Sequence, residues 1–161
     1  MDKYIHRENL ALFKKRFAEA KDEAQRQIVA KLLAEEKGRG GWTDVDLTHN
    51  IAGRRFDKSV ETAAYRVIQE ALSNVRKHAG AEKVRVGITL SGDDTPHSSL
   101  DIYVRDWGRG FRPGDPAEAS LHFGLQGMAE RVGVVEGTLS VESSPGTGAT
   151  VRAHIPVLDS D

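Results

Sequence analysis

Four polar side chains near the end of one segment, "QEALSNVRKHAG" (residues 69–80), have types and a spacing that could do chemistry. Glu70 and Asn74 are about one helical turn apart, and Lys77 and His78 follow about one turn later. A carboxylate and an amide oxygen suit Mg²⁺, which keeps several waters and takes few protein ligands. The two basic groups suit phosphate oxygens. From this helix alone, a purely structural interpretation fits equally well. In it, Glu70 and Asn74 face water, and Lys77 and His78 stabilise the negative C-terminal end of the helix dipole.

A second segment, "VRDWGRGF" (residues 104–111), joins an acidic residue to two glycines. Asp106, Gly108 and Gly110 have D-x-G-x-G spacing, which lets the backbone turn sharply beside the carboxylate. A carboxylate at the floor of a cleft can accept a hydrogen bond from an exocyclic amine such as that of adenine. The alternative for this motif is an ordinary glycine-rich hairpin.

Two further segments are rich in glycine. In "HFGLQGMAERV", Gly124 and Gly127 are predicted to open a helix, where backbone N–H groups and the helix dipole attract phosphate. Alone, the pair indicates no more than a turn from a loop into a helix. "SSPGTGATV" predicts a turn from Ser143 to Gly148 between two strands.

The polar stripe belongs to a helix predicted over residues 58–79. Its apolar positions gather on one face at about 100° per residue, and the four polar side chains fall on the flank of that face. These apolar positions are Val60, Ala64, Val67, Ile68, Ala71 and Val75. A stripe on the flank of a buried face can line a cleft.

The other elements that must position these groups are five β-like runs and a second helix predicted over about 124–134. The runs are "WTDVDLTHNI", "KVRVGITL", "LDIYVRDW", "GTLSVESS" and "ATVRAHIPV". Several alternate apolar and polar residues, as half-buried antiparallel strands do. The segment 91–99 is predicted to be a solvated hairpin connection. These elements predict an α+β fold in which helices cover one face of a single mixed sheet.

The N-terminal segment differs in pattern. Residues 1–36 predict an amphipathic helix with an apolar seam from Leu10 to Leu32, and the glycines of residues 37–41 predict a linker to a separate domain, 42–161. The seam indicates helix pairing, either with the chain's own domain or with a second copy.

The composition excludes several classes of protein. Among 161 residues, 23 Lys and Arg oppose 24 Asp and Glu, and this balance indicates no nucleic-acid or membrane partner. The absence of cysteine excludes disulfides and thiolate metal sites. No apolar run approaches the roughly 20 residues of a membrane span, and the N-terminus lacks a signal-peptide pattern. These features predict a soluble, cytoplasmic protein.

Taken in order, the segments resemble the ATP-binding domain of sensor histidine kinases, in the superfamily that includes the gyrase, Hsp90 and MutL ATPases. The matching boxes are "EALSNVRKH" (the N box), "DWGRG", "GLQGM" and "PGTGAT". The phrases "YRVIQEALSNVRKHA" and "GLQGMAERV" are most similar to the subfamily of the nitrate sensors and the desaturase thermosensor. The resemblance covers about residues 41–157 and implies a Bergerat-type two-layer sandwich that binds ATP and Mg²⁺.

The resemblance also implies roles for individual residues. Glu70 matches the base that polarises the attacking group, and Asn74 matches the Mg²⁺ ligand. Lys77 and His78 match basic positions near the phosphates, and Asp106 matches the residue that accepts from the adenine amino group. The remaining implied nucleotide-site positions are Gly108, Gly110, Gly124, Leu125, Gly127, Met128 and Thr150.

Three features depart from the family pattern. His122 stands where the second glycine box usually has its first Gly, which predicts a stiffer lid or an altered nucleotide affinity. The lid, the segment between Phe111 and Gly124, is short. Trp107 replaces a residue that is usually small and polar, and is expected either to stack near the base or to cover the sheet edge.

The resemblance does not supply a phosphate acceptor. His6 is the only histidine before the linker, and no E-L-H-D-like motif surrounds it. The sequence therefore predicts a catalytic domain that transfers the γ-phosphoryl group of ATP to a histidine of a partner domain or chain in two-component signalling. The predicted partners are a histidine-bearing dimerisation domain, a response regulator, or a second copy paired through the N-terminal helix. Alternatives are a non-catalytic nucleotide-gated interaction module and an anti-sigma-type serine kinase, with direct ATP hydrolysis as a third.

Overall fold

The computed structural model describes residues 44–51, 56–92 and 97–157. The elements are β1 (Asp44–His49), α3 (Lys58–Asn74), a π-helical turn (Val75–Ala79), β2 (Lys83–Ser91), β3 (Ser99–Asp106), a 3₁₀ turn (Pro116–Glu118), α4 (Ala119–Val134), β4 (Thr138–Ser144) and β5 (Gly148–Pro156). The predicted N-terminal helix, the linker and His6 lie outside the described residues.

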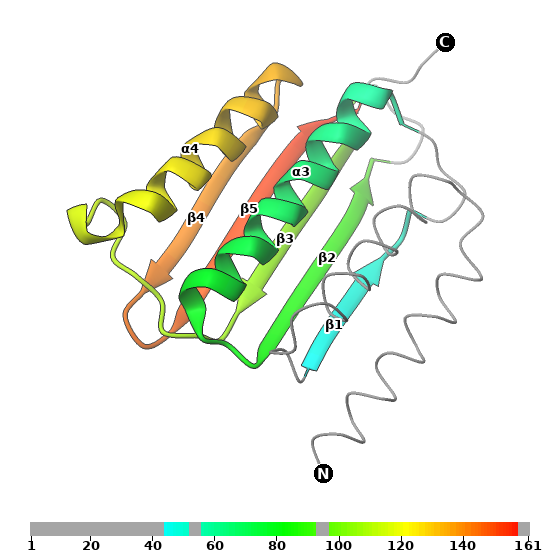
Figure 1. Cartoon of the computed structure of the whole chain (residues 1–161). Helices are drawn as coiled ribbons and strands as arrows, with labels where there is room; N and C mark the ends of the chain where they lie inside the picture. Colours follow the sequence, from blue (N-terminus) through cyan, green and yellow to red (C-terminus); the bar gives the residue numbers. More distant parts are fainter. Residues whose placement is uncertain (1–43, 52–55, 93–96, 158–161) are drawn as a thin grey trace.

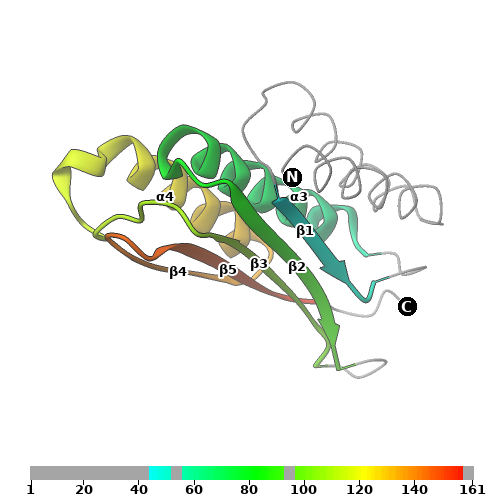
Figure 2. The ribbon, with the colours of Figure 1, turned by 90° about the horizontal axis from the view of Figure 1, so that it is seen from below.

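The strands form one five-stranded sheet in the order β1-β2-β3-β5-β4 (Figure 1). β1 pairs with β2 in parallel, and the other three pairs are antiparallel. Both helices lie on the same face of the sheet, as the view in Figure 2 shows. The predicted α+β sandwich with a mixed, mostly antiparallel sheet is therefore confirmed. The five predicted strands lie where the alternating runs placed them.

Helix α3 begins where a side chain caps it. The Asp57 carboxylate accepts from the Ser59 backbone N–H at 2.8 Å, and so satisfies one of the unpaired donors of the first turn. All six predicted apolar positions are buried, together with Ala63 and Leu72. The predicted span 58–79 is confirmed, but its last turn is π-helical and ends at Gly80 with φ 59°. Such turns occur frequently at functional sites.

Helix α4 begins at Ala119, so the prediction that Gly124 and Gly127 open it is wrong. The Asp115 side chain accepts from the Ala117 N–H at 3.0 Å, which starts a 3₁₀ turn directly before the helix. Leu121 is 3% exposed, so burial of its side chain favours helical structure upstream of the glycines. Both glycines consequently lie inside the helix, where their N–H groups are not those of the first turn.

The core fills the space between the helices and the sheet. Its most completely buried side chains come from both helices and from β2 and β5: Val67, Leu72, Val84, Val86, Met128, Val132 and Ile155. The other face of the sheet carries charged side chains, and three of them (Lys83, Arg85 and Arg105) lie about 5–6 Å from the Trp107 ring. Within the described segments, no helix is long and apolar enough to cross a membrane.

Candidate functional site

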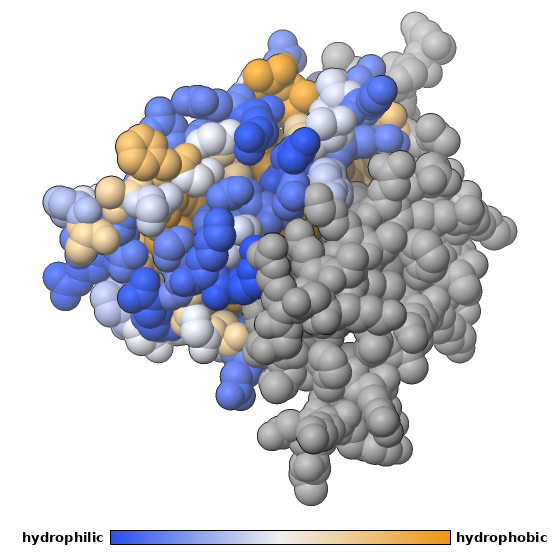
Figure 3. Space-filling view, viewed as in Figure 1, coloured by the Kyte–Doolittle hydropathy of each residue, from blue (hydrophilic) through white to orange (hydrophobic). Residues whose placement is uncertain are grey.

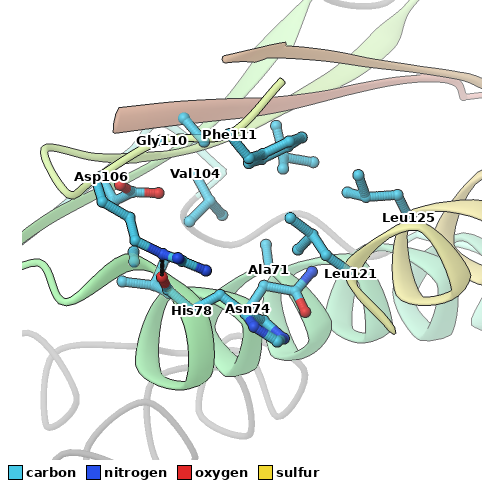
Figure 4. A pocket seen from close by; sticks show the side chains of 14 residues that line it. Ala71, Asn74, His78, Val104, Asp106, Gly110, Phe111, Leu121 and Leu125 are labelled. Carbon is cyan, nitrogen blue, oxygen red and sulfur yellow. Dashed lines mark hydrogen bonds between the residues drawn. The ribbon is translucent and has the colours of Figure 1, made fainter. Parts of the chain in front are cut away.

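A cavity of about 30 Å³ lies between the end of α3, strands β3 and β5, and the first half of α4 (Figure 4). Its walls are largely apolar: Ala71, Val104, Phe111, Leu121, Leu125 and Val151. Four polar residues also line it: Asn74 and His78 near the end of the helix, Asp106 at the end of β3, and Arg109 in the glycine loop. An apolar pocket with a few converging polar groups is typical of a small-molecule site.

Asp106 is the acceptor at the floor of this cavity. It ends β3 and is only 5% exposed. Its Oδ1 accepts from the Gly108 N–H at 2.8 Å. Burial raises the pKa of this carboxyl group, and hydrogen bonds from the Gly108 and Ala149 backbone oppose that shift. A buried carboxyl in an apolar site is suited to recognise a donor such as an exocyclic amine.

The glycines of the loop are required by close approaches of the backbone. A Cβ at Gly108 would lie 2.3 Å from the Ala79 carbonyl oxygen, and one at Gly110, where φ is 63°, would lie 2.0 Å from the Ser144 carbonyl oxygen. The D-x-G-x-G loop is therefore fitted between the end of α3 and the turn that joins β4 to β5. The predicted shaping role of both glycines agrees with this geometry.

Glu70, Asn74 and Gly124 meet beside the cavity. A Cβ at Gly124 would lie 2.6 Å from Glu70 Oε1 and 3.5 Å from Asn74 Oδ1, so α4 lies directly on these two side chains. The Nδ2 atom of Asn74 is buried and has no hydrogen-bond partner in the described part of the chain. An unpaired buried donor costs about 1–3 kcal/mol, so this N–H group is free to donate to a bound ligand, whereas Oδ1 is the atom of Asn74 that could coordinate a metal ion.

The other predicted positions fall into two groups. His78 and Leu125 line the cavity. Lys77 is exposed and does not line it, Gly127 faces open space, and Met128 is fully buried in the core. Of the predicted basic residues, only His78 lines the cavity, and of these three lid positions, only Leu125 does.

The side chain of Thr150 does not line the cavity. Thr150 Oγ1 accepts from Arg105 at 3.0 Å, and the residues on either side of it, Ala149 and Val151, line the cavity instead. Because side chains alternate along a strand, a shift of one residue moves the side chain to the opposite face of the sheet. Trp107 likewise does not line the cavity and lies among cations of the outer face.

Sequence reasoning missed several residues that line the cavity. Arg109 stands between the two predicted glycines, and Phe111 follows them directly. Because both residues are adjacent in sequence to the predicted glycines, their position could have indicated that they line the site. Leu121 was assigned to the lid, and only the early start of α4 brings its side chain to the cavity.

The residues present fit a nucleotide with its metal. Asp106 offers an acceptor, the apolar walls suit a flat base, and Glu70 with Asn74 offers two oxygen donors. No group of three or more acidic, His or Cys side chains within the described ranges could hold a metal ion alone. A hard cation at this place would therefore take oxygen ligands from the phosphates as well.

Comparison with known proteins gives a family match and several relatives. The model of the histidine kinase-, DNA gyrase B- and HSP90-like ATPase family matches residues 59–159. The chain is 39% identical over 113 residues to the signal transduction histidine-protein kinase/phosphatase DegS of Brevibacillus brevis, covering 70% of this chain and 28% of that protein. It is 36% identical over 110 residues to the oxygen sensor histidine kinase NreB of Staphylococcus carnosus, covering 68% and 30%. The chain thus spans less than a third of these relatives' length.

Solved structures share the fold. The histidine kinase domain of the blue-light activated histidine kinase of Erythrobacter litoralis EL346 superposes with a TM-score of 0.60 at 21% identity, covering 80% of this chain and 61% of that one. The mycobacterial sensor histidine kinase MprB gives a TM-score of 0.56 at 19% identity, covering 84% and 95%. With the family match extending over more than half of the chain, this protein belongs to the family of histidine kinase-, DNA gyrase B- and HSP90-like ATPases.

Proposed function

We propose that this chain is the ATP- and Mg²⁺-binding catalytic domain of a histidine kinase, and that it transfers the γ-phosphoryl group to a histidine of a partner domain or chain. The observation that carries the proposal is the buried Asp106 carboxyl at the floor of an apolar cavity, with Glu70 and the unpaired Asn74 amide beside it. The similarity to DegS and NreB, both named as histidine kinases, supports the acceptor chemistry.

In this proposal, different side chains act on the base and on the phosphates of ATP. Asp106 accepts a hydrogen bond from the adenine amine, and the apolar walls exclude water from the base. Asn74 and Glu70 face the phosphate side, where Asn74 offers its amide oxygen to Mg²⁺ and Glu70 orients the attacking nitrogen and accepts its proton. Bound Mg²⁺ neutralises charge that develops on the phosphoryl group. In the transfer, a nitrogen–phosphorus bond forms as the bond from the γ-phosphorus to the bridging oxygen breaks, and ADP leaves.

The partner is a histidine-bearing dimerisation domain, which passes the phosphoryl group on to a response regulator. We infer a cytoplasmic location from the absence of cysteine in the sequence and from the finding that no helix among the described residues could span a membrane. The proposal places the acceptor on a partner domain or chain, because none of the four family boxes has a histidine in an acceptor context.

A binding experiment tests the nucleotide half of the proposal. ATP affinity is measured by calorimetry with Mg²⁺ for the wild type and for Asp106→Asn, with Glu130→Gln on the exposed surface of α4 as a matched control. The Asp106 variant should bind at least about tenfold more weakly, because each lost factor of ten is about 1.4 kcal/mol and a lost buried hydrogen bond costs about that much. Equal affinity of wild type and Asp106→Asn would show that Asp106 does not bind the base.

A second experiment tests the acceptor. A supplied histidine-bearing domain is incubated with the protein and labelled ATP, and the label is followed in acid and in base. Phosphohistidine is labile in acid and stable in base, whereas phosphoserine behaves in the opposite way. Acid-stable label would point to a serine kinase, and the absence of label from every partner would favour a nucleotide-gated interaction module.

A further inference from the structure

The first half of α4 closes the site in this structure. Gly124 lies on Glu70 and Asn74, while Leu121 and Leu125 face Phe111 across the cavity (Figure 4). The space left, about 30 Å³, is only two to three times the roughly 10–15 Å³ that one water molecule needs, so it has room for a few waters and not for a nucleotide. If the proposed function holds, on which this inference rests, the first turns of α4 must move before a nucleotide can enter.

Arg109 joins the glycine loop to the end of the helix that carries Glu70 and Asn74. Its backbone N–H donates to the Ala79 carbonyl at 2.8 Å, and its backbone carbonyl accepts from the Gly146 N–H at 2.7 Å. Its Nε donates to the His78 carbonyl (Figure 4). Arg109 thus satisfies two carbonyl groups that a helix leaves unpaired at its C-terminus, and its charge suits the negative end of the dipole.

The same guanidinium also reaches α4. Its terminal nitrogen lies 3.5 Å from Glu118 Oε2, and the Glu118 side chain is only 19% exposed. Glu118 is the residue directly before α4, and its side chain makes no capping hydrogen bond to the helix. The contact with Arg109 therefore links the start of α4 to a loop that is fixed on both sides.

We propose that the Arg109–Glu118 ion pair is a latch that holds the first turns of α4 over Glu70 and Asn74 when no nucleotide is bound. Arg109 is a positioning residue in this role, because it acts through Glu118. Partly exposed ion pairs of this kind are weak, so loss of the pair should shift the closed-to-open equilibrium by about two- to fivefold. Apparent nucleotide affinity should rise by up to the same factor, since a closed state lowers it.

The test uses Glu118→Gln, Arg109→Gln and the double variant, with Glu130→Gln as a matched control for loss of one negative charge on α4. Hydrogen exchange of the amides of residues 119–124 is measured without nucleotide, and ATP affinity is measured with Mg²⁺. Glu118→Gln should speed exchange and tighten ATP binding by about two- to fivefold. In the Arg109→Gln background, the Glu118 substitution should have little further effect on exchange, because the pair is already broken.

The outcomes separate the latch from the proposed function. The latch is wrong if Glu118→Gln leaves exchange unchanged, if its effect persists in the Arg109→Gln background, or if ATP binding weakens as exchange speeds up. A persisting effect would instead indicate an interaction of Glu118 with the helix dipole. If exchange responds as expected but no variant binds ATP, the latch stands and the proposed nucleotide function fails.

Discussion

The carboxyl group of Asp106 is buried and has a raised pKa, a combination that is common at functional sites. It is 5% exposed and its pKa is raised by burial, yet its partners inside the chain are backbone N–H groups of Gly108 and Ala149 and the charge of Arg105. A raised pKa means that the folded protein favours the protonated form more than the unfolded chain does. The group therefore contributes most to stability below its unfolded pKa of about 3.9, and this contribution is lost as pH rises through the raised value.

Asp106→Asn should separate stability from binding. The amide has nearly the same shape and can still accept from the Gly108 N–H, but carries no charge that burial would penalise. We expect a melting temperature at pH 7 equal to or above that of the wild type, with the gain shrinking toward pH 4, where the wild-type carboxyl becomes protonated. Thermal unfolding at both pH values measures this, with Glu130→Gln as the exposed control. A variant destabilised more at pH 7 than at pH 4 would contradict the assigned cause of the pKa shift.

Substitution of Asn74 should also affect function without lowering stability, but for a different reason. Its Nδ2 atom is buried without a partner among the described residues, so Asn74→Ala removes an unsatisfied group. We expect the free energy of unfolding to stay within about 1 kcal/mol of the wild type, while Mg²⁺-dependent phosphoryl transfer to a supplied histidine-bearing domain is lost. Gln69→Ala, on the same helix and outside the cavity lining, is the matched control and should transfer normally. Normal transfer by Asn74→Ala would rule out the metal role.

At the scale of elements, the two glycines of α4 have different surroundings although both are inside the helix. Gly127 faces open space, whereas a Cβ at Gly124 would lie 2.6 Å from Glu70 Oε1. Ala is favoured over Gly inside a helix by about 0.8–1 kcal/mol. Gly127→Ala should therefore stabilise the protein by about that amount and leave phosphoryl transfer unchanged.

Gly124→Ala should instead change the site. The added methyl group would displace the flexible Glu70 carboxylate, so we expect the rate of phosphoryl transfer to fall by about tenfold or more, while denaturant unfolding shows little loss of stability. Because both variants gain the same helix propensity from Gly→Ala, a difference between their transfer rates reports only the effect on the site. Equal rates for both would mean that Glu70 does not act from the position seen here.

The spacing of apolar residues in the sequence predicted the elements in which buried side chains recur at a regular interval. The 3.6-residue spacing from Val60 to Val75 and the alternation in the five runs located α3 and the strands, since both reflect which side chains face the core. The start of α4 could not be found in this way, because the glycines suggested a helix start while burial of Leu121 extends the helix upstream. Nor could spacing show that the side chain of Thr150 lies on the face of the sheet away from the cavity, because neighbouring residues of a strand face opposite sides.

Contacts between segments distant in sequence were the least predictable part of the site. The Arg109 side chain reaches His78 and Glu118 through the packing of the loop against two helices. The one local signal was its place between two glycines. Spacing could indicate a nucleotide site at the polar stripe, but not that α4 would lie on Glu70 and Asn74.

At the scale of the whole molecule, the helical face exposes apolar side chains near the candidate nucleotide site. Phe123 is 75% exposed and Val134 is 82% exposed, both on α4, and Figure 3 shows orange patches over the helices of this face. Large exposed apolar side chains often mark interaction surfaces. Phe123 directly precedes Gly124, where an added Cβ would lie 2.6 Å from Glu70 Oε1, whereas Val134 is the last residue of the helix.

Phe123 should therefore contribute to docking of the histidine-bearing partner, and Val134 should not. The two positions are about 16 Å apart along the helix, at about 1.5 Å per residue, so only Phe123 is close enough to meet a partner whose histidine approaches Glu70. We expect Phe123→Ser to slow transfer to a supplied partner domain by about tenfold, through a higher KM for that domain, with ATP affinity unchanged. Val134→Ser removes a comparably exposed apolar group and should transfer at the wild-type rate. Equal slowing by both substitutions would indicate a nonspecific effect on α4, and no slowing by Phe123→Ser would place the docking surface on another face of the domain.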